Sequence, residues 1–312
     1  SRTLAALMKC FSHIRREEPM MIYGAIEAGG TKFVCAVGTE ELTILERVSF
    51  PTTTPVETMK QVIDFFKPFK EQLAGIGVGC FGPIDIQCKS TSFGHITSTP
   101  KLAWQNFNFV GTLKQYFNIP IEWTTDVNAA CYGEYVAGSG KGLAGVAYFT
   151  VGTGIGGGAL FNGTFVEGFS HPEMGHMLIK RHPKDNFSGN CPFHQDCLEG
   201  MAAGPAIEKR LGVKGQNLLA DDSFWQIEAF YLAQCAYNTT LMFSPDRIIF
   251  GGGVMKQEHM KKKVQDKFVE LINGYVEIPP IDSYIITPEL GDNAGIIGGL
   301  ALARKAVRNK QP

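Results

Sequence analysis

The sequence lacks the features that mark several large classes of protein. No apolar run approaches the ~20 residues that a membrane-spanning helix needs. The formal net charge is −1, so there is no basic excess of the kind that binds nucleic acid or an anionic membrane. The eight cysteines show no paired spacing outside one central loop, which argues against a disulfide-stabilised secreted protein. We therefore expect a cytoplasmic protein without a nucleic-acid or membrane partner.

Two common nucleotide-binding motifs are also missing. The P-loop pattern G-x-x-x-x-G-K-[ST] does not occur. A dinucleotide fingerprint needs glycines that open a helix, but residues 152–158 (GTGIGGG) lead into residues 159–161 (ALF), which have the composition of a strand. A nucleotide would have to be bound in another way.

Glycine, in contrast, is abundant and clustered. Of the 36 glycines, many fall in three turns that follow apolar strands, at residues 28–32, 152–158 and 251–253. Backbone N–H groups in such turns can approach phosphate oxygens closely, because no side chains intervene. A single turn of this kind could equally be an ordinary hairpin. Three turns at equivalent positions favour phosphate binding.

The hydrophobic pattern predicts an α/β fold. We expect strands at residues 22–27, 33–37, 42–50, 73–80, 121–124, 145–151, 159–161, 247–250 and 284–287. We expect helices at residues 56–69, 110–117, 126–137, 202–211, 223–242, 258–272 and 293–307.

One succession of elements occurs twice: strand, glycine turn, two strands, helix, strand. This repeat predicts two duplicated lobes around a cleft, an N-terminal lobe at residues 22–125 and a C-terminal lobe at residues 126–312. The closing helix at residues 293–307 could pack back on the first lobe. Residues 1–21 are expected to be a leader, disordered or of cloning origin, with a targeting peptide as the alternative.

A metal site is predicted in the loop that interrupts the second lobe. Cys191, His194 and Cys197 recur every third residue, and His176 stands upstream. Two thiolates and two imidazoles match the ligands of a closed tetrahedral zinc site. Residues 180–195 are too polar to form a core, so a bound ion could stabilise them instead. The alternatives are ordinary thiols, a disulfide between the two cysteines, or His182 as the fourth ligand.

Two carboxylates flank the same loop. Glu173 stands three residues before His176, and Glu199 stands two residues after Cys197. An ion that ties both ends of the loop would also fix these two side chains. They are hydrogen-bond acceptors of the sort that recognise hydroxyl groups.

Asp126 stands where a predicted strand meets a predicted helix. An aspartate there is commonly an N-cap, and a cap would also hold the carboxylate at the cleft. In that place it could take the proton of a sugar hydroxyl as the oxygen attacks the γ-phosphate of ATP. Such transfer otherwise depends on positioning and on charge neutralisation, normally with Mg²⁺.

The sequence resembles the ROK family of bacterial sugar kinases and repressors, most closely its zinc-containing fructokinases. The resemblance runs from about Ile22 to the C-terminus. It is carried by the metal loop and by six motifs, which are residues 27–32 (EAGGTK), 99–104 (TPKLAW), 124–128 (TTDVN), 152–158 (GTGIGGG), 172–176 (PEMGH) and 251–253 (GGG).

The resemblance implies two ribonuclease-H-like lobes of the actin and hexokinase type that close on ATP and a sugar. Asp126 is then the general base. Residues that would face the sugar are Glu173, His176, Glu199 and Thr125. His176 would ligate zinc through one ring nitrogen and present its other edge to the sugar. Residues that would contact the nucleotide are Gly30, Thr31, Lys32, Gly152, Thr153, Gly154, Gly204, Pro205, Gly251, Gly252 and Gly253. The family also suggests a homodimer.

Three positions depart from the family pattern. Members that phosphorylate glucose or N-acetylmannosamine usually have Asn where this chain has Thr125, which argues against glucose. Many members have Asp where this chain has Glu27. Their zinc loops commonly hold three Cys and one His, whereas His194 replaces a Cys here; imidazole is also a good zinc ligand.

We therefore expect an ATP-dependent kinase that phosphorylates the 6-hydroxyl of fructose, with Mg²⁺ and Zn²⁺ as its metals. A mannokinase or glucokinase is the alternative within the family. A sugar-sensing repressor is the alternative from another class, and it would need a helix-turn-helix segment for which residues 1–21 are too short.

Overall fold

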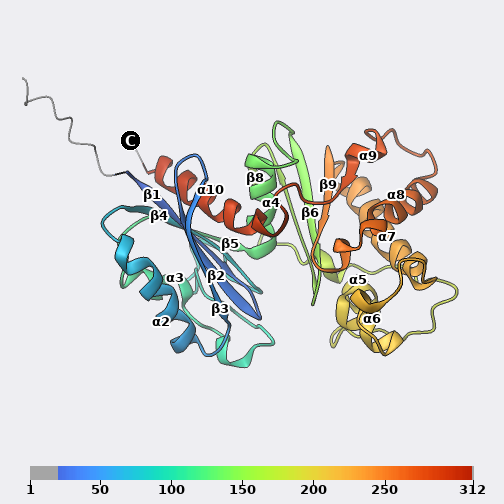
Figure 1. Cartoon of the computed structure of the whole chain (residues 1–312), viewed down its shortest axis with the longest axis horizontal. Coiled ribbons are helices and arrows are strands. Elements are labelled where there is room, and N and C mark those ends of the chain that lie inside the picture. Colours follow the sequence, from blue (N-terminus) through green and yellow to red (C-terminus); the bar gives the residue numbers. More distant parts are fainter. Residues whose placement is uncertain (1–19, 311–312) are drawn as a thin grey trace, which may run out of the picture.

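The computed structural model describes residues 20–310, so the predicted leader at residues 1–21 lies almost entirely outside the described part of the chain. The described residues form two five-stranded sheets flanked by helices (Figure 1). The first sheet has the order β3-β2-β1-β4-β5, with β1 (Ile22–Ala28), β2 (Lys32–Gly38), β3 (Ile44–Pro51), β4 (Leu73–Cys80) and β5 (Ile121–Thr125). The second has the order β10-β9-β6-β7-β8, with β6 (Gly145–Val151), β7 (Ile155–Phe161), β8 (Thr164–Phe165), β9 (Arg247–Gly251) and β10 (Ile285–Ile286).

The two sheets repeat one topology. In the first, β1 pairs antiparallel with β2 and parallel with β4, and β2 and β4 continue to β3 and β5 in the same senses. In the second, β6 takes the place of β1, with β7 and β8 antiparallel on one side and β9 and β10 parallel on the other. This identity of order and direction confirms the predicted duplication.

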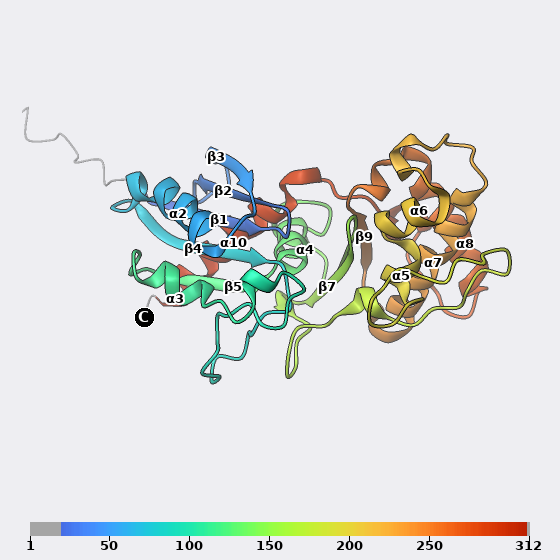
Figure 2. The same ribbon diagram turned by 90° about the horizontal axis from the view of Figure 1, so that it is seen from below.

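Helices cover both faces of each sheet (Figure 2). The α-helices are α2 (Pro55–Phe66), α3 (Phe109–Lys114), α4 (Asp126–Ala137), α5 (Leu198–Ala202), α6 (Gly204–Leu211), α7 (Phe224–Phe243), α8 (Glu258–Ile272), α9 (Ile281–Tyr284) and α10 (Ala294–Arg308). Short 3₁₀ turns are η1 (Lys67–Phe69), η2 (Leu102–Trp104), η3 (Met174–His176), η4 (Gly215–Asn217), η5 (Val254–Lys256) and η6 (Gly291–Asn293). No helix among residues 20–310 has both the length and the apolar character needed to cross a membrane.

The first sheet is buried on both faces because its strands alternate between two cores. Ile22 and Ile26 of β1 belong to the core with α2 and α3, while Tyr23 and Ala25 belong to the core with α10. This is the period of two expected of a strand, whose successive side chains point to opposite faces. The last helix of the chain thus packs on the first strand.

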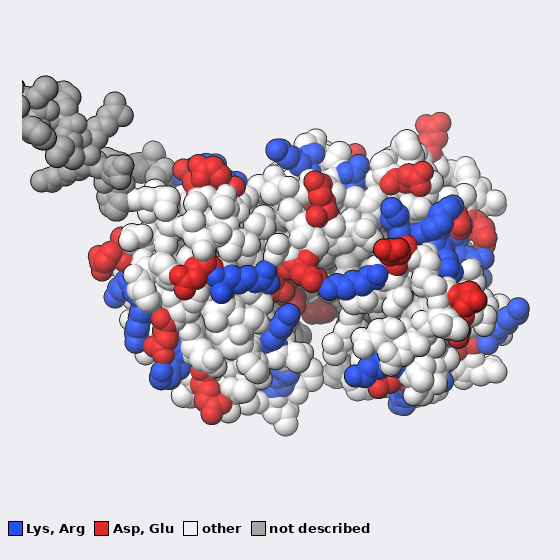
Figure 3. All heavy atoms as spheres, viewed as in Figure 1, with Lys and Arg blue, Asp and Glu red and all other residues white. Residues whose placement is uncertain are grey.

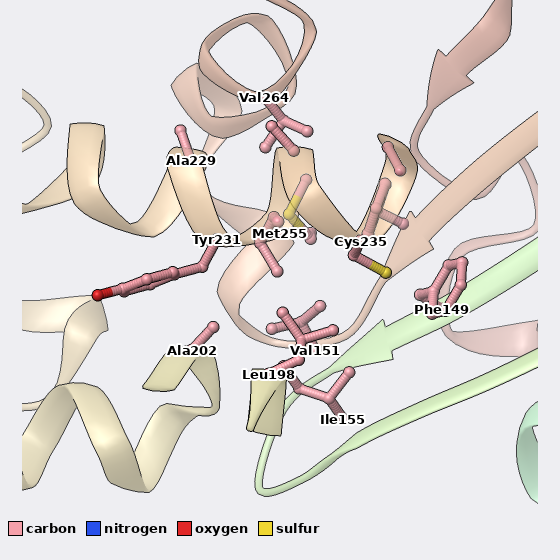
Figure 4. Packing of buried hydrophobic residues seen from close by; sticks show 14 of the residues in the cluster. Phe149, Val151, Ile155, Leu198, Ala202, Ala229, Tyr231, Cys235, Met255 and Val264 are labelled. Atoms are coloured by element: carbon pink, nitrogen blue, oxygen red, sulfur yellow. The ribbon is translucent and has the colours of Figure 1, made fainter. Parts of the chain in front are cut away.

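The second sheet is organised in the same way. Val127 and Cys131 of α4 pack on one face. On the other face, strand residues such as Phe149 and Val151 pack beside Cys235 of α7 (Figure 4). The short helix α5 adds Leu198 and Ala202 to this core (Figure 4). The end of the predicted metal loop is therefore anchored in the core of the second sheet.

Three local predictions were wrong. The helix predicted at residues 202–211 begins two residues later, as α6, because Ala203 has an extended backbone (φ −70°, ψ 158°), and the preceding helix α5 was not predicted. The glycine turn predicted at residues 152–158 ends early, since Gly156, Gly157 and Gly158 pair with β6. Of the strand predicted at residues 284–287, only β10 is extended, and α9 precedes it.

The helices α4 and α10 cross in backbone contact. A Cβ added to Gly298 of α10 would lie 1.7 Å from the carbonyl oxygen of Ala129, and a Cβ on Gly133 of α4 would lie 2.2 Å from that of Ala294. A methyl group at either position would push the helices apart. Glycine is required here by the close approach.

We predict that Gly298→Ala destabilises the protein by at least about 2 kcal/mol, because a packed crossing has no room for an extra carbon. Urea unfolding followed by circular dichroism measures the change. Gly168→Ala is the matched control, because a Cβ there meets no atom within 4 Å. Equal stability of the two variants would contradict the tight crossing.

Candidate active site

Asp126 is the first residue of α4, directly after β5. The N-cap of this helix is Thr125, whose side chain accepts a hydrogen bond from the backbone N–H of Asn128 (3.2 Å). The interpretation of Asp126 as the cap was therefore wrong. The Asp126 carboxylate instead accepts from the N–H of Val127 (2.9 Å), and it lines a cavity between the lobes.

Burial raises the pKa of Asp126 to about 7. The negative charges of Glu27 and Glu173 add to this rise, and the hydrogen bond from Val127 opposes it. Lys and Arg are not among the main causes of this pKa shift. The carboxyl group is therefore poised to exchange a proton near neutral pH, as a general acid or base must.

The first two glycine turns are the tips of corresponding hairpins. One joins β1 to β2 and is closed by the N–H of Gly29 donating to the carbonyl of Lys32 (3.0 Å). The other joins β6 to β7 and is closed by the N–H of Gly152 donating to the carbonyl of Gly154 (2.9 Å). Thr31 and Thr153 are exposed at the two tips.

A cavity of about 670 Å³ lies between the lobes. Glu27 and Asp126 line it from the first sheet and the start of α4, and Gly251 and Gly252 line it from the end of β9. Four cations border the same space, namely Lys32, Arg47, Lys256 and Lys261. On the face shown in Figure 3, acidic and basic side chains alternate across the boundary between the lobes. Lys256 and Asp292, which both line the cavity, form an ion pair (2.9 Å).

A second cavity of about 420 Å³ lies on the other side of the Gly251–Gly253 turn. Five of the residues predicted for the nucleotide line it together, namely Gly152, Thr153, Gly204, Pro205 and Gly253. The N–H of Gly204, the first residue of α6, donates to the carbonyl of Gly152 (2.7 Å) and so fixes one wall. Lys32, Gly251 and Gly252 line the first cavity instead, while Gly30, Thr31 and Gly154 belong to the two turns.

The four residues predicted as metal ligands come together. The ligand atoms of His176, Cys191, His194 and Cys197 all lie within 4.8 Å of one another, so they could hold a metal ion. Nδ1 of His176 is 3.7 Å from the sulfur of Cys191 and 3.5 Å from that of Cys197. Nδ1 of His194 is 3.7 Å from the sulfur of Cys191. Both cysteines are free thiols, so the disulfide alternative is not formed.

The far edge of His176 faces the carboxylates. Its Nε2 lies 3.8 Å from one oxygen of Glu199, and the other oxygen accepts from the N–H of Ile155 at the start of β7 (2.9 Å). Glu173 directly precedes the short helix η3 that carries His176. Glu173 is also close enough to Asp126 for its charge to raise the pKa of Asp126. These side chains therefore form one polar region beside the proposed base.

Two residues of the region had no role in the sequence-based interpretation. The side chain of Lys101 lies across the first glycine turn, and its Nζ would be 3.9 Å from a Cβ on Gly30. Trp225 lines the second cavity, held by a hydrogen bond from its Nε1 to the carbonyl of Leu219 (2.9 Å). Lys101 belongs to the family motif at residues 99–104, so its presence near the site could have been predicted from the sequence. Trp225 is one apolar residue of a buried helix and gives no such signal.

Comparison with known proteins places this arrangement in a family. The family model described as "ROK family" matches residues 23–306. The chain belongs to the ROK family. It is 49% identical to the fructokinase of Streptococcus mutans serotype c (strain ATCC 700610 / UA159) over 91% of this chain and 98% of that protein. It is also 49% identical to the fructokinase of Pediococcus pentosaceus over 93% of this chain and all of that protein.

A solved structure with the same fold is the ROK family glucokinase from Streptomyces griseus in complex with glucose and AMPPNP. It superimposes with a TM-score of 0.73 at 23% identity, over 91% of this chain and 99% of that one. At this identity the likeness concerns the fold alone. Together with the repeated sheets, it confirms the predicted ROK-type fold of two lobes.

We predict that Asp126→Asn stabilises the folded protein at neutral pH. The pKa of Asp126 is about 7 in the fold and 3.8 as its ordinary value, so the fold favours the protonated form. The contribution of this group to the free energy of unfolding is fully present below about pH 4 and is lost as the pH rises through 7. The advantage of Asp126→Asn should grow over this interval to on the order of 4 kcal/mol.

Urea unfolding of both proteins at several pH values measures this difference. Asp64→Asn is the control, because the hydrogen bonds from Lys60 and Lys67 lower the pKa of this exposed carboxyl. A gap between Asp126→Asn and wild type that does not change between pH 4 and 8 would contradict the raised pKa.

Proposed function

We propose that the protein is an ATP-dependent sugar kinase that transfers the γ-phosphate to the 6-hydroxyl of fructose. The single observation that carries this proposal is the place of Asp126. Its carboxyl group has a raised pKa, lines the cavity between the lobes and lies near Glu173. The extensive identity to two bacterial fructokinases supports fructose as the sugar.

In this proposal the base of ATP occupies the second cavity. Its walls are the start of α6, the Gly251–Gly253 turn and the ring of Trp225. The phosphates extend from there towards the tips of the two hairpins, where the N–H groups around Thr31 and Thr153 can donate to their oxygens. A bound Mg²⁺ would neutralise phosphate charge at this place. Lys101, lying on the first turn, supplies a further positive charge near the phosphates.

The sugar is proposed to lie beside Glu173, Glu199 and the Nε2 edge of His176. Carboxylates accept hydrogen bonds from hydroxyl groups, and two carboxylates of fixed direction select the arrangement of those groups. The fixed direction of Glu199 comes from the N–H of Ile155. Thr125 was predicted to face the sugar as well. Its hydroxyl caps α4, and its assignment to the sugar pocket stays a prediction.

Asp126 is proposed to act as the general base. As the sugar oxygen attacks the γ-phosphorus, the carboxylate takes the hydroxyl proton, and the bond to the ADP oxygen breaks. A base with a pKa near the working pH is ionised in part and can still hold the proton it receives. The nearby charges of Glu27 and Glu173, together with burial, keep Asp126 in that range.

The metal is proposed to be zinc. A tetrahedral zinc ion with bonds of about 2.3 Å to sulfur and about 2.0 Å to nitrogen holds a sulfur and a nitrogen ligand about 3.6 Å apart. The three contacts between imidazole Nδ1 and cysteine sulfur measure 3.5, 3.7 and 3.7 Å. Three of the six donor pairs therefore already have the separation that a tetrahedral ion sets, and all four donors lie within 4.8 Å of one another. When bound, zinc would keep the loop folded and hold His176 in its orientation.

Three further assignments belong to this proposal. We place the boundary of the lobes at Thr125, where the first sheet ends and α4 begins. We propose a cytoplasmic protein, in agreement with the free thiols of the cysteines among residues 20–310. The homodimer suggested by the family is also retained as a proposal.

We predict that purified protein releases ADP with fructose faster than with mannose, glucose or N-acetylmannosamine. Coupled ADP-release assays over the four sugars measure the ratio of kcat/KM. Asp126→Asn should lose at least about 10²-fold in kcat, the contribution of a general base, while fructose binding survives. A clear preference for another sugar would overturn fructose, and retained turnover in the variant would overturn the base.

We also predict that removing the metal lowers the stability of the protein. Cys197→Ser should lose the ion and with it several kcal/mol of unfolding free energy, since binding of a structural zinc contributes to folding. Metal content by atomic spectroscopy and the melting temperature are measured together. Cys88→Ser is the matched control, because Cys88 is an exposed free thiol outside the cluster. A metal-free protein of unchanged melting temperature would refute a structural ion.

A further inference from the structure

His171 is a buried histidine between the lobes that the proposed mechanism does not use. Its side chain is 3% exposed, so it does not reach the sugar pocket itself. Its Nε2 accepts a hydrogen bond from the backbone N–H of Ile84 (3.1 Å), a residue of the first lobe. An accepting Nε2 carries no proton, so the proton of the neutral ring is on Nδ1.

The Nδ1 edge of this ring faces Glu173. The distance from Nδ1 to the nearer carboxylate oxygen is 3.5 Å, and the Glu173 side chain is 51% exposed. An exposed glutamate samples many rotamers, and ordering them opposes the binding of a ligand. The Nδ1 edge of a buried ring at this distance favours the rotamers that keep the carboxylate beside it before the sugar arrives.

The far partner of His171 is rigid. Ile84 is 2% exposed and forms a bridge with Ile96. The next residue, Asp85, donates its backbone N–H to the backbone carbonyl of His95 (2.9 Å). The carbonyl of Asp85 accepts from the indole N–H of Trp123 in β5 (3.0 Å). The imidazole is therefore held against a fixed part of the first lobe.

A second contact joins the same two segments. The side-chain amide of Gln87 donates to the carbonyl of Gly168 (2.7 Å). The segment that carries Glu173 is thus bound to the first lobe at two points, Gly168 and His171. The segment therefore keeps a fixed position relative to the first lobe, although in the sequence it comes directly after β8 of the second sheet.

We propose that His171 is a positioning residue, which orients the sugar-facing carboxylate of Glu173 from its anchor at Ile84. This inference rests on the proposed function, because it takes Glu173 as a sugar ligand. It assigns to His171 a contribution to fructose affinity that passes through Glu173 alone. ATP binding is then independent of His171, and the transfer step depends on it only through the charge of Glu173 near Asp126.

His171→Leu removes both ring contacts at similar volume. The KM for fructose should rise about tenfold, as when an orienting partner of a binding group is lost, while the KM for ATP and kcat change by less than about threefold. His171→Gln keeps an acceptor and a donor and should restore most of the affinity. His95→Leu is the matched control, because this half-buried histidine in the neighbouring loop has no contact with Glu173. Its KM for fructose should equal that of wild type.

A double-mutant cycle separates positioning from a general structural effect. If His171 acts through Glu173, adding His171→Leu to Glu173→Gln changes the KM for fructose by less than about twofold, because the group to be positioned is already altered. Full additivity of the two effects would overturn the proposal. An equal rise of the KM for ATP would overturn it as well.

If His171→Leu does not fold, His171→Asn replaces it in the same cycle, since its shorter amide cannot reach the N–H of Ile84. The assay also distinguishes failure of the proposed function from failure of the role of His171. Wild-type protein that prefers another sugar refutes fructose, and the cycle then tests His171 with that sugar. Protein that phosphorylates none of the four sugars overturns both the function and the positioning residue.

Discussion

The burial of Asp126 near two other carboxylates is the interaction on which the candidate site depends. A desolvated carboxyl group among like charges is unfavourable when ionised, and no cation is among the main causes of its pKa shift. The surrounding structure keeps it in place. Thr125 caps α4, α4 crosses α10 in backbone contact, and residues of both lobes line the cavity that Asp126 lines. Much of the fold thus positions a group that does not stabilise it at neutral pH.

A metal ion bound to His176, Cys191, His194 and Cys197 would tie together the two ends of a long loop. Between η3 and α5 the chain has no regular secondary structure, yet both ends of this segment carry ligand atoms of one cluster. The same ends carry Glu173 and Glu199. Ile179 and Phe187 of this segment pack against the core of the second sheet, and a bound ion would add a further attachment. In the proposed function it would hold the sugar-facing carboxylates in place as well as stabilise the lobe.

The sequence predicted most of the fold because the strands of both sheets are apolar and glycine marks their ends. The bounds predicted for β4, α4, β6 and α8 agree with the structure. The predicted start of α6 was two residues early because alanine favours a helix locally, and tertiary packing overrides that preference at Ala203. The four ligand residues were also predictable, since their types and spacing carry the chemistry. His171 and Trp225 were not, because their contacts join residues far apart in the sequence and leave no local pattern.

The glycine crossing of α4 and α10 has a consequence for motion. Where two helices touch through backbone atoms, few side chains interlock at the contact. The angle between the helices can then change by a small amount with little repacking. Each helix belongs to a different flanking core, and the two hairpin tips stand away from the crossing point. A small rotation there would change the gap between the tips while both sheets stay intact. Ligands that bridge the gap could thus draw the lobes together without disturbing either core.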